Sequence, residues 1–321
     1  MSGTFRVLEL FCGIGGCAAA LGDAASVAAA VDVNCNALKA YDHNFPHATV
    51  TCSVESISPQ TLQDWKADLW WISPPCQPYT RRGRKRDEED PRAASLLALI
   101  PKIGEVRPAY LALENVPEFC HSRMYERLMT QLQLTGYTVR EQFLCATELG
   151  LPNRRRRFYL VASRKGLRPW SSPPIDRFSI RSILQKQVDP YLEAPAIVLQ
   201  KYRQAIHVVP WDEDQITNCF TSAYGRSYVR SGSYLSQNGL IRRFSPTEIL
   251  KILGFPAAYS LPTSLSLRQA WPLVGNSLCV PAVRHILSCI PELRALGMAR
   301  EHDRAVPGGT IQIRGGARLL V

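Results

Sequence analysis

The stretch RVLELFCGIGG, residues 6–16, decides the fold that this sequence predicts. An apolar run, Arg6–Leu10, leads into a loop with three glycines, and an alanine-rich segment follows. A strand, a tight glycine turn and a helix are the first unit of an open α/β sheet, and glycines let the backbone approach a ligand. The next apolar run ends at Asp32, a residue type suited to bonding ribose hydroxyls. We therefore expect an adenosine-bearing cofactor at this turn.

Two kinds of cofactor fit such a turn. The loop lacks the third glycine of the dinucleotide-binding fingerprint, which places a pyrophosphate at the helix start. A methyl donor has no phosphate and needs fewer close backbone approaches. The loop taken alone favours the methyl donor and leaves the dinucleotide open.

Outward from this unit, apolar runs of strand length alternate with helix-like segments. This rhythm is typical of an α/β protein with an open, largely parallel sheet covered by helices. The expected strands after Arg6–Leu10 are Val27–Val31, Thr49–Cys52, Leu69–Ile72, Tyr110–Glu114, Val139–Cys145 and Phe158–Ala162.

The pattern changes after residue 165, where proline-rich and polar sequence replaces the alternation. Helical periodicity returns at Ser245–Leu253, where Ser245 and Glu248 have the spacing of a capping box, and at Val280–Ile290. The sequence therefore predicts four parts: a cofactor-binding catalytic domain at 1–165, a small second lobe at 166–242, C-terminal helices that complete the catalytic domain at 243–295, and a Gly/Arg-rich tail at 296–321.

Composition narrows the partners and the compartment. The chain has 321 residues, is 46% apolar and carries 38 basic against 27 acidic side chains, a net charge of +11 that favours a polyanion such as nucleic acid. No signal peptide pattern and no apolar stretch of membrane-spanning length is present, which predicts a cytoplasmic protein without a membrane partner. The ten cysteines lack zinc-type spacing, so we expect neither a disulfide framework nor a metal.

A cysteine stands between prolines in SPPCQPYT, residues 73–80, directly after an apolar run. The carboxyl end of a strand faces the active-site crevice of an open α/β sheet, and flanking prolines stiffen the loop that holds the thiol. The basic residues of RRGRKR, 81–86, follow and would favour the reactive thiolate of Cys76. Taken alone, the segment also fits a structural cysteine beside a solvated basic loop that is balanced by the acidic run 87–90.

Three further segments argue for chemistry. Glu114 ends another apolar run, so its carboxylate is expected at the same sheet edge as Cys76. In Asn153–Arg157 alternate arginines point to one face of a strand. Gly275–Ser277 lies near the end of the chain.

The order and text of these segments resemble the cytosine-C5 methyltransferases. The resemblance covers about Arg6 to Ile290 and fails only in the middle lobe. It implies a class I methyltransferase fold, that is a Rossmann-like doubly wound sheet with a small target-recognition lobe, and S-adenosyl-L-methionine as cofactor. For catalysis it implies Cys76 as the nucleophile toward cytosine carbon 6, Glu114 as the acid at N3 and the exocyclic amine, Arg155 as the residue that positions the base, and Arg157 as its support.

The same resemblance supplies the cofactor-binding residues. They are Phe11 against adenine, Gly13 and Gly15 at the methionine part, Asp32 on the ribose, Asn276 and Ser277 near the carboxylate, and also Val33, Ser53, Val54 and Pro74. The sequence departs from the family in two places. The usual acid after the third strand is replaced around Cys52–Val54, which puts the adenine contact in doubt, and Asn153 stands for the common glutamine.

The middle of the chain bears on the substrate. Fewer than eighty residues separate Gly166 from Arg242, which is short for an elaborate DNA-reading lobe, and an unpaired RNA loop already exposes its bases. The segment CFTSAYG, 219–225, resembles the type-2 branch, which modifies transfer RNA, as do the nucleophile loop and 150–162. This branch implies cytosine 38 of a tRNA anticodon loop, commonly of tRNA-Asp. The expected substrate contacts are Gln77, Thr80, Arg82, Arg84, Cys219, Phe220, Thr221 and Tyr224, with Arg226, Arg230, Arg242 and Arg243 as phosphate contacts.

Two other readings stay open. One is a DNA cytosine-5 methyltransferase of a restriction-modification or orphan type. The other is a catalytically inactive nucleic-acid-binding relative, against which the intact Cys76, Glu114, Arg155 and Asn276 argue. We expect the protein to act as a monomer on tRNA, with DNA as the alternative.

Overall fold

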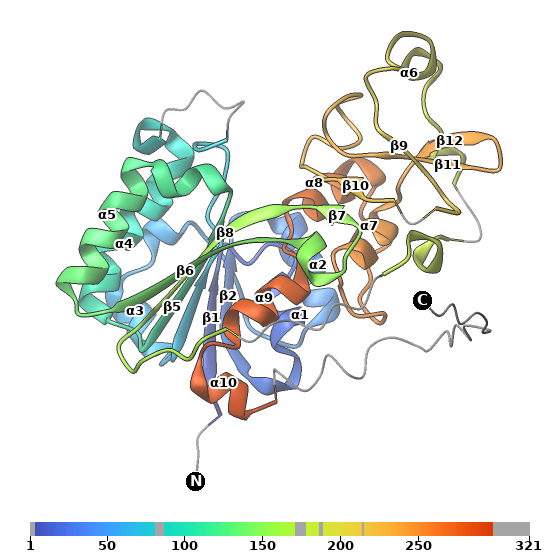
Figure 1. Ribbon diagram of the computed structural model, residues 1–321. Coiled ribbons are helices and arrows are strands. Elements are labelled where there is room, and N and C mark those ends of the chain that lie inside the picture. Colours follow the sequence, from blue (N-terminus) through green and yellow to red (C-terminus); the bar gives the residue numbers. More distant parts are fainter. Residues whose placement is uncertain (1–3, 81–86, 171–177, 186–188, 214, 298–321) are drawn as a thin grey trace, which may run out of the picture.

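The computed structural model describes residues 4–80, 87–170, 178–185, 189–213 and 215–297 (Figure 1). A twisted sheet with helices on both faces forms the large unit. A smaller group of strands and loops stands beside the carboxyl ends of the central strands, and the two strands that carry residues 138–145 and 156–163 extend toward it.

Seven strands form the large sheet, in the order β3-β2-β1-β4-β5-β8-β6. The first five in this order are parallel to one another, while β8 runs antiparallel to both of its neighbours. The strands are β1 (Arg6–Leu10), β2 (Ser26–Asp32), β3 (Thr49–Thr51), β4 (Leu69–Ile72), β5 (Tyr110–Asn115), β6 (Thr138–Cys145) and β8 (Arg156–Ser163). Every expected strand is present, and the prediction of an α/β fold with a largely parallel sheet is confirmed.

Successive side chains of the buried strands lie on opposite faces of the sheet and form two separate apolar cores. On one face, Trp71 and Val161 pack with α1, α2 and α9, and on the other, Trp70 and Leu160 pack with α3, α4 and α5. This two-sided burial explains why a central strand such as β4 is apolar along its whole length. The helices are α1 (Gly16–Leu21), α2 (Cys35–Asn44), α3 (Pro59–Asp64), α4 (Ala94–Val106), α5 (Arg123–Leu134), α6 (Ala196–Lys201), α7 (Pro246–Ile252), α8 (Leu267–Asn276), α9 (Val280–Leu287) and α10 (Pro291–Ala295).

Side-chain caps fix where several helices begin. Ser245 accepts a hydrogen bond from the Glu248 amide at 3.1 Å, and the Glu248 carboxylate accepts one from the Ser245 amide at 2.9 Å. This reciprocal capping box is the one that the sequence spacing predicts. The helix that follows, α7, packs against α8, and α9 packs against α1, so the C-terminal segment returns to the large unit.

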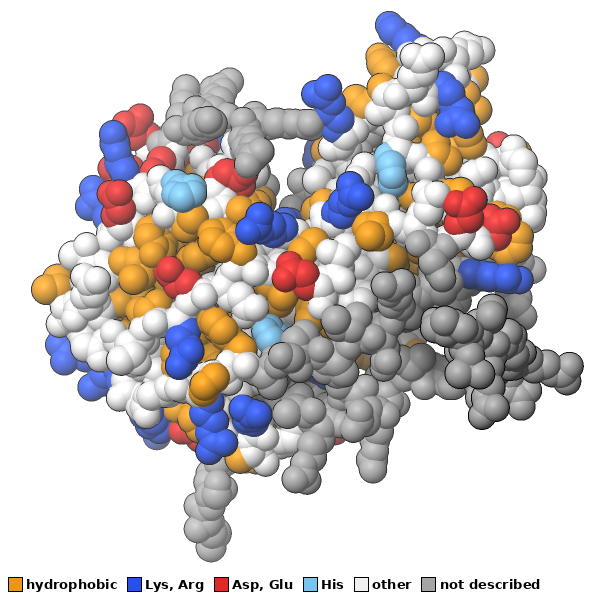
Figure 2. Space-filling model, viewed as in Figure 1, with side chains coloured by type: hydrophobic (Ala, Val, Ile, Leu, Met, Phe, Trp, Pro, Cys, Tyr) orange, Lys and Arg blue, Asp and Glu red, His pale blue; other side chains and the backbone are white. Residues whose placement is uncertain are grey.

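The smaller unit, called here the small lobe, consists of α6 and of β9 (Val208–Pro210), β11 (Tyr234–Gln237) and β12 (Leu240–Arg243) with the loops between them. A short parallel pair, β10 (Thr217–Asn218) with β7 (Asn153–Arg154), ties it to the large unit. In Figure 2 the molecule is hollowed between the upper part of the large unit and the small lobe. Within the described part of the chain, no helix is long and apolar enough to cross a membrane.

Candidate active site

The ends of two neighbouring strands bring Cys76 and Glu114 to one edge of the sheet. Ile72, the last residue of β4, pairs with Leu113 of β5. Beyond this pair the Asn115 side-chain amide donates to the Pro74 carbonyl at 3.3 Å, which joins the two chain segments after the strands. With this strand register, the Cys76 loop and Glu114 lie at the same edge of the sheet, as the sequence predicts.

The loop that carries Cys76 is held from inside the protein. The Tyr79 amide donates to the Cys76 carbonyl at 3.0 Å, which closes a turn. The Tyr79 ring is buried and meets Phe119 edge-on, with 5.0 Å between the ring centroids. Thr80 donates its hydroxyl to the Gln77 carbonyl at 3.3 Å. The Cys76 thiol therefore lies on a turn that the buried Tyr79 ring anchors in the core.

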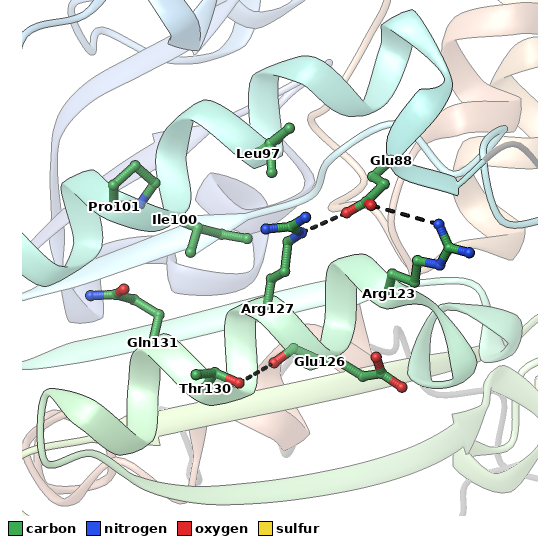
Figure 3. Close-up of a pocket in the computed structure, with 9 residues that line it drawn as sticks. All are labelled: Glu88, Leu97, Ile100, Pro101, Arg123, Glu126, Arg127, Thr130 and Gln131. Carbon is green, nitrogen blue, oxygen red and sulfur yellow. Dashed lines mark hydrogen bonds and ion pairs between the residues drawn. The ribbon is translucent and has the colours of Figure 1, made fainter.

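The far end of this loop is fastened to α5. The Asp87 carboxylate accepts a hydrogen bond from the Arg123 amide at 2.6 Å, and Glu88 pairs with Arg127 at 2.5 Å. Figure 3 shows this pair at one end of a groove of about 590 Å³ between α4 and α5. None of the predicted site residues lines the groove, so it is not the reaction site. Within the acidic run at 87–90, Asp87 and Glu88 attach the chain to α5, whereas Asp90 pairs with Arg92. Arg82 and Arg84, two predicted substrate contacts, fall in 81–86, outside the described residues.

An ion pair and a thiol contact centre on Arg157. Its Nε lies 3.1 Å from the Glu114 carboxylate, and its NH2 donates to the sulfur of Cys219 at 3.7 Å. Glu114 is only 8% exposed. Burial raises the pKa of the Glu114 carboxyl, while Arg157 and Arg155 oppose the rise. A carboxyl with a raised pKa retains its proton nearer to neutral pH, as an acid that donates to a base requires.

Arg155 acts as a clamp between three chain segments. Its guanidinium donates to the carbonyls of Phe220 at 3.1 Å, of Gly275 at 3.2 Å, and of Ser277. A Cβ on Gly275 would collide with the Thr221 backbone, so only glycine permits this approach. The sequence predicts that Arg155 positions the substrate base. In the structure it joins the Cys219 segment to the Gly275–Ser277 segment, and Arg157 is the arginine that pairs with Glu114.

The two thiols near these arginines differ. Burial raises the pKa of Cys76, although Arg157 and Arg155 lower it. Burial also acts on Cys219, but there Arg155 and Arg157 outweigh it and the pKa of Cys219 is lowered. All ten cysteines lie within the described residues and are free thiols. In the described residues no group of three or more His, Cys, Asp or Glu side chains is arranged to hold a metal.

The alternation expected for Asn153–Arg157 is present. Asn153 and Arg155 are buried and Arg157 is half-buried, while Arg154 and Arg156 are exposed. The Asn153 side-chain amide donates to the Thr217 hydroxyl at 2.9 Å and to the Asn218 carbonyl at 3.0 Å, and so holds β10 beside β7.

The glycine loop after β1 is built around Asp32. Its carboxylate accepts hydrogen bonds from the Gly13 and Asn34 amides, both at 2.8 Å. Gly13 and Gly15 have φ values of +54° and +83°, which explains glycine at both positions. A carboxylate with two backbone donors keeps further lone pairs for hydroxyl groups.

Three observations fit a ligand at this loop. No atom lies within 4 Å of the position that a Cβ on Gly13 would take. Val33 is 66% exposed and directly follows Asp32, the half-buried last residue of β2. The buried hydroxyl of Ser277 has no hydrogen-bond partner among the described residues. Open space, an apolar surface and an unused hydroxyl are what an adenosine with an amino-acid tail would use.

The other predicted cofactor residues differ in exposure. Asn276 is exposed, Phe11 and Ser53 are half-buried, and Val54 and Pro74 are buried. Ser53, at the place of the family's missing acid, accepts a hydrogen bond from the Glu55 amide at 3.3 Å.

Several predicted substrate residues lie in the interior. Phe220 and Tyr224 are buried, and the Tyr224 hydroxyl donates to the Ser233 carbonyl at 2.7 Å. Direct contact of either ring with a substrate would require the loop to open. Thr221 is half-buried and donates to the Ser231 carbonyl at 3.4 Å.

Arg242 and Arg243 correct the sequence-based expectation. Both were expected as phosphate contacts, but Arg242 is buried and pairs with the buried Glu248 at 2.8 Å. Arg243 is buried with its guanidinium 5.6 Å from the Trp271 ring centroid. Both side chains therefore make their contacts inside the protein, whereas Arg226 and Arg230 are exposed.

The sequence motifs do not point to one buried acid, Glu9. Glu9 is the next-to-last residue of β1, is fully buried, and accepts a hydrogen bond from the Tyr41 hydroxyl at 3.1 Å. Burial raises its pKa to about 8. Tyr41 also lies 3.0 Å from His47 Nδ1. A single acid inside an apolar run was the available signal, since a charged residue rarely occupies a buried strand without a partner.

Solved structures place the fold in a class. A methyltransferase of Entamoeba histolytica superposes with a TM-score of 0.84 at 25% identity, over 92% of this chain and 99% of that one. The parallel-rich sheet with its glycine loop is thus the fold of a methyltransferase.

Sequence relatives define the reaction within that class. The model of the C-5 cytosine-specific DNA methylase family matches residues 5–205 and 191–292. A tRNA (cytosine(38)-C(5))-methyltransferase of Spodoptera frugiperda is 29% identical, over 89% of this chain and 99% of the relative. A DNA (cytosine-5)-methyltransferase of Dictyostelium discoideum is 25% identical, over 89% and 94%. The chain belongs to the C-5 cytosine-specific DNA methylase family and is a cytosine-C5 methyltransferase.

Proposed function

We propose that this enzyme methylates carbon 5 of a cytosine in tRNA, with S-adenosyl-L-methionine as methyl donor and Cys76 as covalent nucleophile. The donor would lie at the glycine loop, with Asp32 at its ribose and Asn276 and Ser277 at its amino-acid part. The open space over Gly13 and the exposed Val33 support this placement. Bound there, it supplies an electrophilic methyl group.

The chain's own residues prepare the cytosine. Carbon 5 is a weak nucleophile, so the Cys76 thiolate adds to carbon 6 and pushes the electron pair of the 5,6 double bond toward carbon 5. Glu114 donates its proton at N3, which neutralises the charge that this addition creates. After carbon 5 carries the methyl group, a base removes its proton, N3 returns its proton to Glu114, and the carbon–sulfur bond breaks, which restores the aromatic ring and frees the Cys76 thiolate. Arg157 holds Glu114 in place at 3.1 Å.

The observation that carries the tRNA assignment is the position of the Cys219 segment. Cys219 contacts Arg157 and Arg155, which supports a place for the segment that resembles the type-2 branch in the proposed reaction site. The relative from Spodoptera frugiperda bears the matching activity in its name, and cytosine 38 of a tRNA of the tRNA-Asp type or another tRNA is the target we propose. Cytoplasmic location and action as a monomer stay predictions from the sequence.

The second candidate is DNA, and the relative from Dictyostelium discoideum supports it. A transfer assay with labelled methyl donor on total tRNA and on duplex DNA separates the two, with Cys76→Ala as the inactive control. We expect label in tRNA with the wild-type enzyme and none with Cys76→Ala. Label in DNA alone would reverse the substrate assignment, and label from Cys76→Ala would remove the covalent mechanism. Sequencing of the labelled tRNA then locates the methylated cytosine.

A further inference from the structure

Two tyrosines meet on the surface of the small lobe. Tyr202 follows α6, and Tyr228 lies in the Cys219 loop, defined as residues 219–233. Their ring centroids are 5.9 Å apart with 36° between the planes. Tyr228 is 37% exposed, and the Lys201 ammonium lies 5.7 Å from the centre of the Tyr202 ring. An aromatic pair beside a cation is thus presented to solvent.

The surroundings of this pair are basic. Between residues 194 and 247 the sequence has acidic side chains only at 212–214. The exposed cations in this span are Lys201, Arg203, Arg226 and Arg230, whereas Arg242 and Arg243 are buried. Figure 2 shows the small lobe at the upper right, with basic side chains at its tip and toward the large unit and acidic ones at its right margin. The exposed charge around the tyrosines suits phosphate groups.

The tyrosine pair is rigidly connected to the reaction site. The Cys219 loop begins at the sulfur that contacts Arg157 and folds back so that the Thr221 amide donates to the Ser231 carbonyl at 2.9 Å. Tyr224 also fixes the loop, because its hydroxyl accepts a hydrogen bond from the Phe244 amide at 2.9 Å. A loop fixed in this way holds Tyr228 at a set distance from Cys219.

Exposed aromatic rings flanked by cations are how proteins hold unpaired nucleotides, because every base offers a face for stacking and every linkage a phosphate. We propose that Tyr202 and Tyr228, with the four exposed cations around them, form a platform that binds an unpaired stretch of the RNA substrate beside the target cytosine. The inference rests on the proposed function and adds a second contact region outside the reaction site. Duplex nucleic acid, whose bases are already stacked, gains nothing from the two rings.

The test compares a double variant, Tyr202→Ala with Tyr228→Ala, with the wild-type enzyme. The ligands are a fluorescent hairpin RNA that carries the methylated loop and the same strand annealed to its complement. We expect binding of the hairpin to weaken by roughly tenfold or more, and binding of the duplex to stay within about twofold. In the transfer assay KM for tRNA should rise while kcat at saturation changes little.

Two further variants exclude trivial causes. Tyr202→Phe with Tyr228→Phe retains both stacking faces and should restore hairpin binding. Tyr191→Ala removes a tyrosine that is 82% exposed in the segment just before α6, and this variant should bind as the wild type does. Thermal melting of each variant checks that it is folded. If the double alanine variant unfolds, Tyr228→Ala alone gives the answer, because it removes the ring that is 37% exposed and should still weaken hairpin binding more than duplex binding.

The outcomes are separable. Unchanged hairpin binding by the alanine pair, or an equal loss on hairpin and duplex, overturns the platform. If the wild type labels DNA and not tRNA, the proposed function fails whatever the tyrosines do. If it labels tRNA and the tyrosine variants behave as the wild type, only the platform fails.

Discussion

Replacing Glu9 by Gln should remove a pH-dependent loss of stability from this enzyme. In the folded protein burial holds the pKa of Glu9 at about 8, against an ordinary value of 4.5. Between these values the folded state therefore binds a proton that the unfolded chain has released. The free energy of unfolding then falls as pH rises through this window, and the contribution is fully present below it. The neighbouring Tyr41, Cys12 and Cys17 stay neutral there, because burial raises the pKa of each.

The size of the effect follows from the two pKa values. A tenfold difference in proton affinity corresponds to about 1.4 kcal/mol, so the window from 4.5 to about 8 limits the loss to about 5 kcal/mol. Between about pH 5 and pH 8 roughly 3 kcal/mol of this should be measurable. Glutamine has a similar shape and no proton to lose. The variant should therefore gain stability on the wild type by this amount as pH rises.

Urea unfolding at several pH values measures the difference directly. Glu126→Gln, at an exposed glutamate, is the matched control and should follow the wild-type profile. Parallel profiles of wild type and Glu9→Gln across the window would refute the reasoning. They would mean that water or a structural rearrangement ionises Glu9 at no cost.

Three further predictions concern the reaction site and the buried ion pair of Arg242. Glu114→Gln should lower kcat about a hundredfold or more while cofactor affinity, measured by calorimetry, is kept. Cys219→Ser keeps an acceptor for Arg157 and should retain more turnover than Cys219→Ala; equal rates would show that the contact is idle. Arg242→Ala leaves Glu248 buried without its partner and should lower the free energy of unfolding by about 3–5 kcal/mol, whereas the exposed Arg226→Ala should change it by under about 0.5 kcal/mol.

The sequence predicts the large sheet well because its strands are buried on both faces. A run such as Leu69–Ile72 is apolar throughout, and that pattern identifies both the strand and its central place. Glu114 and Cys76 follow as edge residues from the same rule. The capping box at Ser245 was also readable, because both of its hydrogen bonds are local.

Pairings between distant residues were not readable in this way. Arg242 and Arg226 look alike in sequence, yet one is buried against Glu248 and the other is exposed. Arg155 has its partners at Phe220, Gly275 and Ser277, and their approach depends on tertiary packing. The sequence shows where an arginine stands, but only the folded structure shows which acceptor its side chain contacts.

The Arg155 clamp also has a consequence for synthesis. It needs Ser277, and the Arg284 side chain of α9 donates to the Ala20 carbonyl of α1 at 2.9 Å, so segments more than a hundred residues apart must meet before the clamp and the helices beside it are in place. Contacts so far apart in sequence form late, because a long loop must close first. On the ribosome, we expect the enzyme to stay inactive until the segment that carries Ser277 and Arg284 has emerged.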